Sequence, residues 1–292
     1  MFPKAPDQHK IGKPLVPNGL GVIYVLFTTI YLFLIYFSGI LPSSNGVSAP
    51  LTLAVCILFG GFMGLLDDWM DLKWRYKAFM PLIAALPLIY LARVDMLRTA
   101  ISLPLIGTIQ FGSWYYFLII PLIVMIVTNT INMLGGLNGL ETVCPAIIII
   151  GLMILSQSYL LLMLGPLLLW LTLSVLNIQG KIFVGNTGSF AIGMTIAAFA
   201  VIADLKATLL ISILPYIFNS SLILLTIFFT KKRAQASFNG KKIVSDHRRS
   251  LVTLLTYHRP LTERQAVAAI SVIVAIFVLI AVLIDLPWPF LI

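Results

Sequence analysis

Residues 49–66 read APLTLAVCILFGGFMGLL and carry no charge, and two adjacent carboxylates, Asp67 and Asp68, follow them directly. An α-helix needs roughly 17–25 such residues to cross the hydrocarbon core of a bilayer. The pattern therefore predicts a membrane-spanning helix that brings two acidic groups to its end. The glycines within the run are small residues that let neighbouring helices approach closely.

The whole chain shares this apolar character. Of its 292 residues, 60% are hydrophobic and only 10% are charged, whereas soluble domains have about 45–50% apolar and about 25% charged residues. This composition excludes a water-soluble globule. Cys56 and Cys144 both lie in apolar runs, which argues against a disulfide scaffold or a thiolate metal site. We expect one integral membrane domain over residues 1–292, embedded in the lipid bilayer, with no nucleic-acid partner.

Eight further apolar segments approach the length of a membrane helix. They are continuous, unlike the alternating strands of a membrane barrel. We therefore predict an all-α, polytopic membrane helix bundle of about nine spans, at residues 20–41, 49–66, 78–92, 114–131, 142–156, 159–178, 188–203, 207–230 and 265–284. Between two of these spans, Pro104, Gly107 and Gly112 punctuate residues 93–113 and predict a small β-hairpin.

The basic residues are distributed unevenly between the two sides of this bundle. If the N-terminal segment 1–19 and every second loop share one side, that side holds 16 of the 19 Lys and Arg residues. The positive-inside rule then places the segment 1–19 and the large basic loop 231–264 in the cytoplasm.

Polar side chains gather in four of the cytoplasmic loops, and the acidic pair begins the first of them. Adjacent carboxylates at a helix end repel each other and are costly to desolvate unless a cation lies near. The alternative is a solvated helix end in which Asp71 and Arg75 form a surface ion pair.

The second polar cluster, residues 128–141, contains three asparagines and the glycines Gly135, Gly136 and Gly139. Glycine turns let the backbone approach a flat ring or a phosphate. Amide side chains suit base recognition, and their oxygens suit hard cations. The alternative is an ordinary polar turn between two helices.

The third cluster covers residues 181–190, where we expect Thr187 or Ser189 to cap the following helix. The fourth is the loop 231–264. Much of its positive charge suits attraction to anionic lipid headgroups, but its paired arginines at 248–249 also suit bidentate phosphate binding. Together, the four clusters supply the groups that metal-dependent phosphoryl transfer requires.

In their order and spacing these motifs resemble the polyprenyl-phosphate N-acetylhexosamine-1-phosphate transferases. The closer resemblance is to the eukaryotic and archaeal branch, which uses UDP-GlcNAc and dolichyl phosphate. The stretches that carry it are Asp67–Lys77, Thr128–Glu141 and Phe183–Thr187, and the similarity extends from Lys13 to the basic loop near Arg249.

The resemblance implies a role for each matching residue. It assigns catalysis to Asp67 and Asp68, and binding of Mg²⁺, with Mn²⁺ as an alternative ion, to Asn132 and Asn186. Substrate binding falls to seven further residues: Lys77 for the pyrophosphate, Gly136, Asn138 and Phe183 for the uracil, and His247, Arg248 and Arg249 for the pyrophosphate and the GlcNAc.

One departure concerns the metal. The family has an aspartate where this chain has Asn186, and an amide lacks the charge that makes carboxylates good ligands for hard cations. Either the substrate pyrophosphate and the acidic pair supply that charge, or the site is weakened.

The resemblance implies transfer of GlcNAc-1-phosphate from UDP-GlcNAc to a polyprenyl (dolichyl) phosphate, with release of UMP. We expect a prokaryotic, archaeal cell membrane, an active site that faces the cytoplasm, and compatibility with a homodimer. Three alternatives stay open: the same chemistry with another UDP-N-acetylhexosamine, a transporter of nucleotide sugars or lipid-linked sugars, and a non-catalytic homologue.

Overall fold

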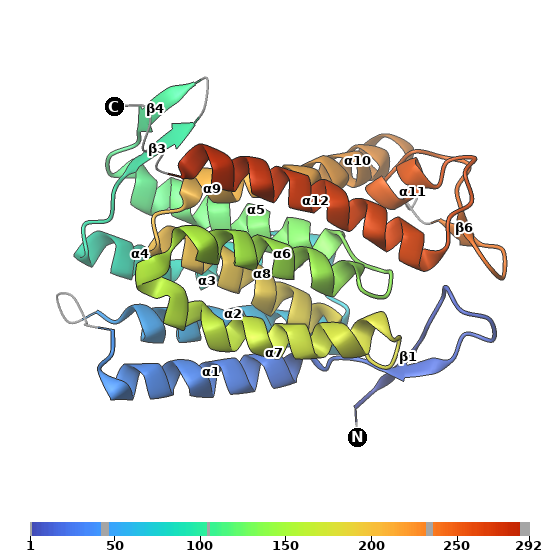
Figure 1. Ribbon diagram of the computed structural model, residues 1–292, viewed down its shortest axis with the longest axis horizontal. Coiled ribbons are helices and arrows are strands. Elements are labelled where there is room, and N and C mark those ends of the chain that lie inside the picture. The colour runs from blue at the N-terminus through green and yellow to red at the C-terminus, as the bar shows by residue number, and fades with distance from the viewer. Residues whose placement is uncertain (1, 42–46, 104–105, 232–235, 287–292) are drawn as a thin grey trace.

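The structure is a computed structural model that describes residues 2–41, 47–103, 106–231 and 236–286. Long helices run back and forth along one common direction (Figure 1). Each of the nine apolar segments predicted from the sequence is helical over most of its length. The long helices and their partners are α1 (Gly21–Ser38), α2 (Ala49–Met70), α3 (Trp74–Ala84), α4 (Leu86–Val94), α5 (Ile120–Met133), α6 (Leu140–Leu155), α7 (Leu160–Ile178), α8 (Gly185–Ile202), α9 (Lys206–Ser212), α10 (Leu214–Thr230) and α12 (Glu263–Asp285).

Within the described residues, seven helical segments are long and apolar enough to cross a membrane. Helices α9 and α10 meet at an angle of 53°, and together they form an eighth membrane-spanning segment if they are counted as one broken helix. Helix α6 has 16 residues and is shorter than the others. The protein is therefore a polytopic helical membrane bundle, and the number of nine spans stays a prediction.

Three of the predicted spans are interrupted next to a proline. Pro87, Pro121 and Pro215 each occupy the second residue of a helix, α4, α5 and α10 respectively. Proline has no N–H to donate to the preceding turn, so the regular hydrogen bonding stops there. In front of α5 the chain instead forms a π-helical turn, η1 (Tyr115–Ile119).

Three short β-hairpins lie at the two ends of the bundle. Strands β3 (Ala100–Leu103) and β4 (Gly107–Gln110) pair antiparallel, which confirms the hairpin predicted within residues 93–113. Two further antiparallel hairpins lie at the opposite end (Figure 1). They are β1 (Lys4–Pro6) with β2 (Leu15–Pro17), and β5 (Ser237–Phe238) with β6 (Ile243–Val244).

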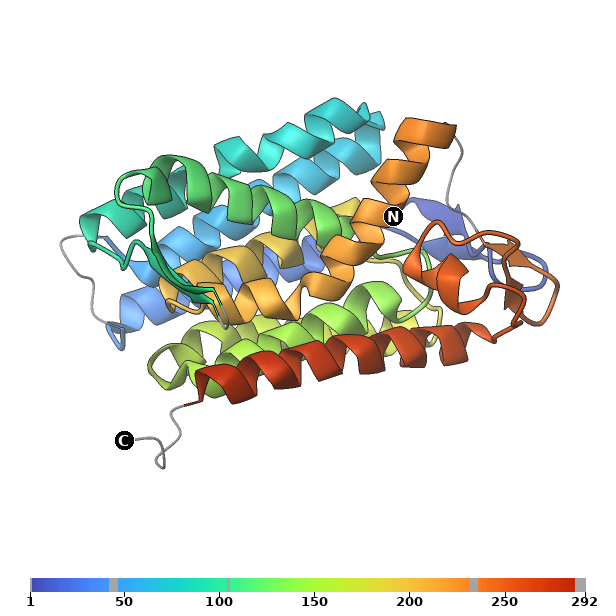
Figure 2. The same ribbon diagram turned by 90° about the horizontal axis from the view of Figure 1, so that it is seen from above.

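Helix α8 forms the core of the bundle. Of its 18 residues, 89% are buried. The helix lies between α2 and α5 on one side and α6 on the other (Figure 2). A Cβ atom added at Gly60 of α2 would lie 2.9 Å from the carbonyl oxygen of Phe190, and one at Gly193 would lie 2.9 Å from the Cα of Thr128 in α5. The small residues therefore permit the close packing that fixes α8 in place.

All four polar clusters lie at one end of the bundle. Helices α2, α5, α7 and α10 end there, and α3, α6, α8 and α12 begin there, together with the short helix α11 (Leu251–Leu255) (Figure 1). The hairpin β3–β4 lies at the other end. Segments that are far apart in the sequence are thus brought to one face.

Candidate active site

The acidic pair lies at the end of α2. Asp67 is 3% exposed, and its Oδ1 accepts a hydrogen bond from the Leu72 N–H (3.1 Å) and contacts the Lys77 ammonium at 2.7 Å. Lys77 also reaches Asp71 at 3.7 Å. The Oδ2 of Asp67 is buried and has no hydrogen-bond partner among the described residues. Asp67 therefore positions Lys77 through Oδ1, while its Oδ2 has no hydrogen-bond donor among the described residues.

Asp68 binds the start of another helix. Its carboxylate accepts hydrogen bonds from the backbone N–H groups of Asn186 and Thr187, both at 2.9 Å, and from the Thr187 hydroxyl at 2.8 Å. The expectation that Thr187 or Ser189 caps this helix is wrong, because α8 begins at Gly185 and neither hydroxyl caps it. The cap comes from α2, and a carboxylate there satisfies N–H groups that have no partner within the helix.

The two residues assigned to the metal are connected through Ser189. Its hydroxyl donates to Asn132 Oδ1 at 2.6 Å and lies 3.3 Å from the backbone carbonyl oxygen of Asn186, one turn earlier in α8. Asp68 and Glu141 lie close enough for their carboxylates to repel each other. Amide and carboxylate oxygens are the ligands that Mg²⁺ and Mn²⁺ prefer, so the chemistry of these four side chains would suit such an ion.

The turn before α6 is fastened from both ends of the chain. The Asn138 N–H and its side-chain NH₂ donate to Glu263 Oε1 at 2.8 and 3.1 Å, and the NH₂ also donates to Asp7 Oδ2 at 2.7 Å. Because carboxylates only accept, the Asn138 amide orientation is fixed. Its carbonyl oxygen is buried and has no partner in the described part of the chain.

Asp7, His9 and Glu263 also place potential metal-ligand atoms within 4.8 Å of one another. The Asn138 NH₂ already contacts both of their carboxylates, and the Lys10 ammonium lies 3.3 Å from Asp7. These hydrogen bonds and this ion pair account for the trio without an ion. We therefore read it as a structural network.

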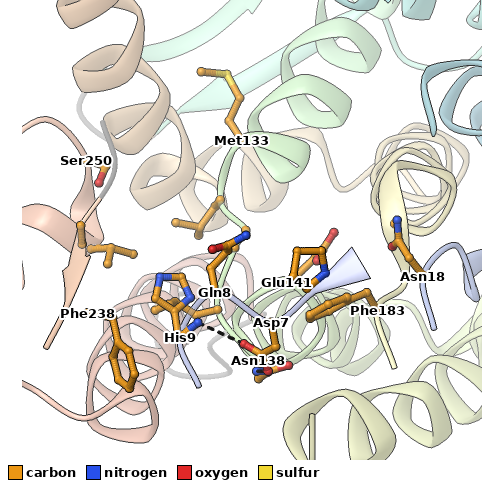
Figure 3. Close-up of a pocket in the computed structure, with 18 of the residues that line it drawn as sticks. Asp7, Gln8, His9, Asn18, Met133, Asn138, Glu141, Phe183, Phe238 and Ser250 are labelled. Carbon is orange, nitrogen blue, oxygen red and sulfur yellow. Dashed lines mark hydrogen bonds between the residues drawn. The ribbon is translucent and has the colours of Figure 1, made fainter. Parts of the chain in front are cut away.

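A cavity of about 780 Å³ opens among these loops. Gly136, Asn138 and Phe183 line it, as do Asp7 and Glu141. Figure 3 shows His9 and Phe238 toward one side of it and Phe183 and Asn18 toward the other. Gly136 has a positive φ of 89°, and a Cβ there would meet no atom within 4 Å, so this wall is open.

The other predicted residues do not line this cavity, although several adjoin it along the chain. Asn132 precedes the lining residue Met133, Asn186 follows Gly185, and Arg249 precedes Ser250. Asp67, Asp68 and Lys77 are placed beside it through the contacts of Asp68 with the start of α8.

The basic segment 247–249 lies at the start of α11. The Arg248 guanidinium stacks over the Tyr257 ring at 4.2 Å from its centroid. His247 Nε2 lies 4.0 Å from Asp246, and the Arg249 N–H donates to the Thr253 hydroxyl at 2.8 Å. The Arg248 side chain is thus held against Tyr257, and the backbone at Arg249 is fixed next to the lining residue Ser250.

Sequence reasoning missed several residues of the cavity. Asp7, Gln8 and His9 belong to the N-terminal segment, which carried no chemical motif of its own. Asn219, by contrast, left a signal, because it is an isolated amide within the apolar helix α10. Polar residues at such positions usually have a specific partner.

Comparisons with known proteins give the class. Residues 50–204 match the model of glycosyl transferase family 4. A protein of Saccharolobus solfataricus, provisionally named UDP-N-acetylglucosamine–dolichyl-phosphate N-acetylglucosaminephosphotransferase, is 30% identical over 96% of this chain and 87% of its own length. The Schizosaccharomyces pombe protein of that name is 25% identical over 74% of this chain and 59% of its own length.

A bacterial relative, the phospho-N-acetylmuramoyl-pentapeptide-transferase of Oceanobacillus iheyensis, is 29% identical over 70% of this chain and 65% of its own length. The chain belongs to glycosyl transferase family 4. Within it the protein is an enzyme, a glycosyl-1-phosphate transferase, and the resemblance found in the sequence is confirmed.

Replacing Asp68 with alanine should loosen the start of α8. The change removes the acceptor of three hydrogen bonds, and loss of a helix cap costs about 1–2 kcal/mol. Hydrogen exchange of the amides at 186 and 187 should therefore accelerate, whereas Asp71→Asn, an exposed carboxylate of the same loop, should leave it unchanged. Equal exchange in Asp68→Ala and the wild type would refute the capping role.

Proposed function

We propose that the enzyme transfers GlcNAc-1-phosphate from UDP-GlcNAc to a polyprenyl phosphate such as dolichyl phosphate. The observation that carries this proposal is the convergence of the acidic pair, the asparagine turn and Phe183 beside one cavity at the end of an apolar bundle. The cavity volume is within the range of small-ligand sites, about 300–1,000 Å³. A lipid-borne acceptor and a soluble donor can meet at such a position. The names of the archaeal and yeast relatives support this pair of substrates.

The base binds between Gly136 and Phe183. Both line the cavity, and the missing Cβ of Gly136 lets a flat ring approach the backbone. Asn138 lines the same cavity and hydrogen-bonds an N–H group of the base. Uracil carries one such imide N–H between two carbonyl groups.

Asn132 and Asn186 would hold Mg²⁺, or Mn²⁺, and Asp68 and Glu141 would contribute negative charge nearby. When bound, the ion offsets charge that develops on the pyrophosphate oxygens, which is a dominant contribution in phosphoryl transfer. Lys77, positioned by Asp67, and the basic segment His247-Arg248-Arg249 provide the remaining positive charge.

The lipid phosphate oxygen attacks the sugar-proximal phosphorus in line, and the bond to the UMP oxygen breaks. A phosphate monoester has a second pKa of about 6 and is mostly dianionic near neutrality, so a strong general base is not required. Asp67 and Asp68 accordingly act in positioning. Asp67 holds Lys77, and Asp68 holds the first turn of α8.

Purified protein with UDP-GlcNAc, Mg²⁺ and dolichyl phosphate should release UMP. Omitting the lipid should abolish the release, because a single displacement leaves no enzyme-bound intermediate. A stoichiometric burst of UMP without lipid would contradict direct displacement.

The same assay decides the donor. The similarity to the pentapeptide transferase makes UDP-MurNAc-pentapeptide a second candidate. A panel of UDP-N-acetylhexosamines and this peptide donor should show the highest kcat/KM for UDP-GlcNAc. Turnover with the peptide donor and none with UDP-GlcNAc would refute the proposed donor and identify the enzyme as a pentapeptide transferase.

Asn186→Asp should lower the Mg²⁺ concentration for half-maximal activity by about tenfold, because carboxylates bind hard cations better than amides do. Mn²⁺ binding to the substrate-free protein, followed by electron paramagnetic resonance, should tighten in parallel. Gln110→Glu, on the exposed strand β4 at the opposite end of the bundle, adds the same charge away from the site and serves as the control. Unchanged affinities at 186 would show that the asparagine is not an ion ligand.

We further propose that the site faces the cytoplasm of an archaeal cell membrane, as the distribution of basic residues favours. Both native cysteines are buried, so an introduced cysteine can report the side. A membrane-impermeant maleimide should label Lys241→Cys in inside-out vesicles and Met96→Cys, near the opposite end, in right-side-out vesicles. The reverse pattern would invert the orientation.

A further inference from the structure

Two buried asparagines connect the loops of the site, Asn177 from behind the cavity and Asn219 from its wall. The first, Asn177 on α7, is 1% exposed. Its Oδ1 accepts hydrogen bonds from the Gly139 N–H at 2.8 Å and the Thr142 hydroxyl at 3.2 Å, and its Nδ2 donates to the Ile182 carbonyl at 2.9 Å. Gly139 ends the asparagine turn, and Ile182 directly precedes Phe183. One side chain therefore spans the two segments that we assign to the base.

The second, Asn219 on α10, is equally buried. Its Nδ2 donates to the Met133 carbonyl at 3.2 Å, and its Oδ1 accepts from the Leu251 N–H at 2.9 Å. Met133 directly follows Asn132 and ends α5, while Leu251 begins α11, two residues after Arg249. Asn219 thus connects the segment assigned to the ion with the basic segment.

Neither amide is needed to hold its own helix together, because both bond to backbone groups of other elements. An amide side chain carries a donor and an acceptor at a fixed separation without a net charge. In apolar surroundings both groups must keep their partners, since an unpaired buried polar group is costly. Each asparagine therefore fixes the distance between two loops.

We propose that Asn177 and Asn219 are positioning residues of the donor site. Asn177 sets the separation of the two walls around the base, and Asn219 aligns the ion-binding segment with the arginines. The inference rests on the proposed function, and both residues act through the backbone of the loops that they join.

The two positions should differ in their kinetic effect. The base is held in the same way in the ground state and the transition state, so loosening its walls raises KM without lowering kcat. Contacts of the ion and the arginines strengthen as charge develops, so misalignment there lowers kcat.

The test uses the full chain in lipid nanodiscs with UDP-GlcNAc, Mg²⁺ and dolichyl phosphate. Asn177→Leu should raise KM for UDP-GlcNAc and the inhibition constant of UMP by the same factor, about tenfold, with kcat nearly unchanged. Asn219→Leu should lower kcat by about tenfold. Leucine keeps a similar volume but removes both hydrogen-bonding groups.

Each variant has a matched control on the same helix. Ser174→Ala on α7 removes a buried hydroxyl whose one bond to the described part of the chain stays within its helix, to the Trp170 carbonyl. Ser220→Ala on α10 removes a hydroxyl that has no partner in the described residues. Both controls should keep wild-type KM and kcat.

If a leucine variant does not fold, Asn177→Asp and Asn219→Asp are used instead, because aspartate keeps the acceptor and loses the donor. The same changes in KM, in the inhibition constant of UMP and in kcat are then expected. Wild-type constants in a folded variant, or equal losses in the serine controls, overturn the inference. Absence of UMP release by the wild type overturns the proposed function instead.

Discussion

The arrangement of the site depends on the carboxylate of Asp68 and the first turn of α8. Three hydrogen bonds join them, and an anion is favoured at a helix N-terminus, where the backbone N–H groups have no internal partners. Because α8 is the most deeply buried spanning helix, its first turn is a fixed reference. The end of α2, and with it Asp67 and Lys77, is positioned relative to that reference.

The position of the Asp68 carboxylate at the start of α8 also gives a physical reason for the asparagine at 186. A carboxylate there would be the third in a neighbourhood where Asp68 and Glu141 already repel each other. An amide offers an oxygen to the ion that we propose and adds no charge repulsion of its own. The two adjacent aspartates therefore have different structural roles, because Asp67 positions Lys77 and Asp68 caps α8.

The sequence predicted the bundle because long uncharged runs have few alternatives to membrane helices, and it predicted the β3–β4 hairpin from Pro104, Gly107 and Gly112. It also predicted which loops converge. It did not predict the hydrogen bonds between them, because contacts such as Asn177 with Ile182 and Gly139 depend on how helices pack. The helix cap was misjudged for the same reason, since local spacing pointed to Thr187 and Ser189 while the acceptor came from α2.

The turn that carries Asn138 is held by Asp7 from the beginning of the chain and by Glu263 from the start of the last helix. A ribosome must therefore have made the start of α12 before this turn has both of its anchors. During membrane insertion, the earlier helices pack while the cavity is still incomplete. Nascent chains that stop before α12 would lack the Glu263 anchor, so this wall of the cavity is fully held only after α12 has been made.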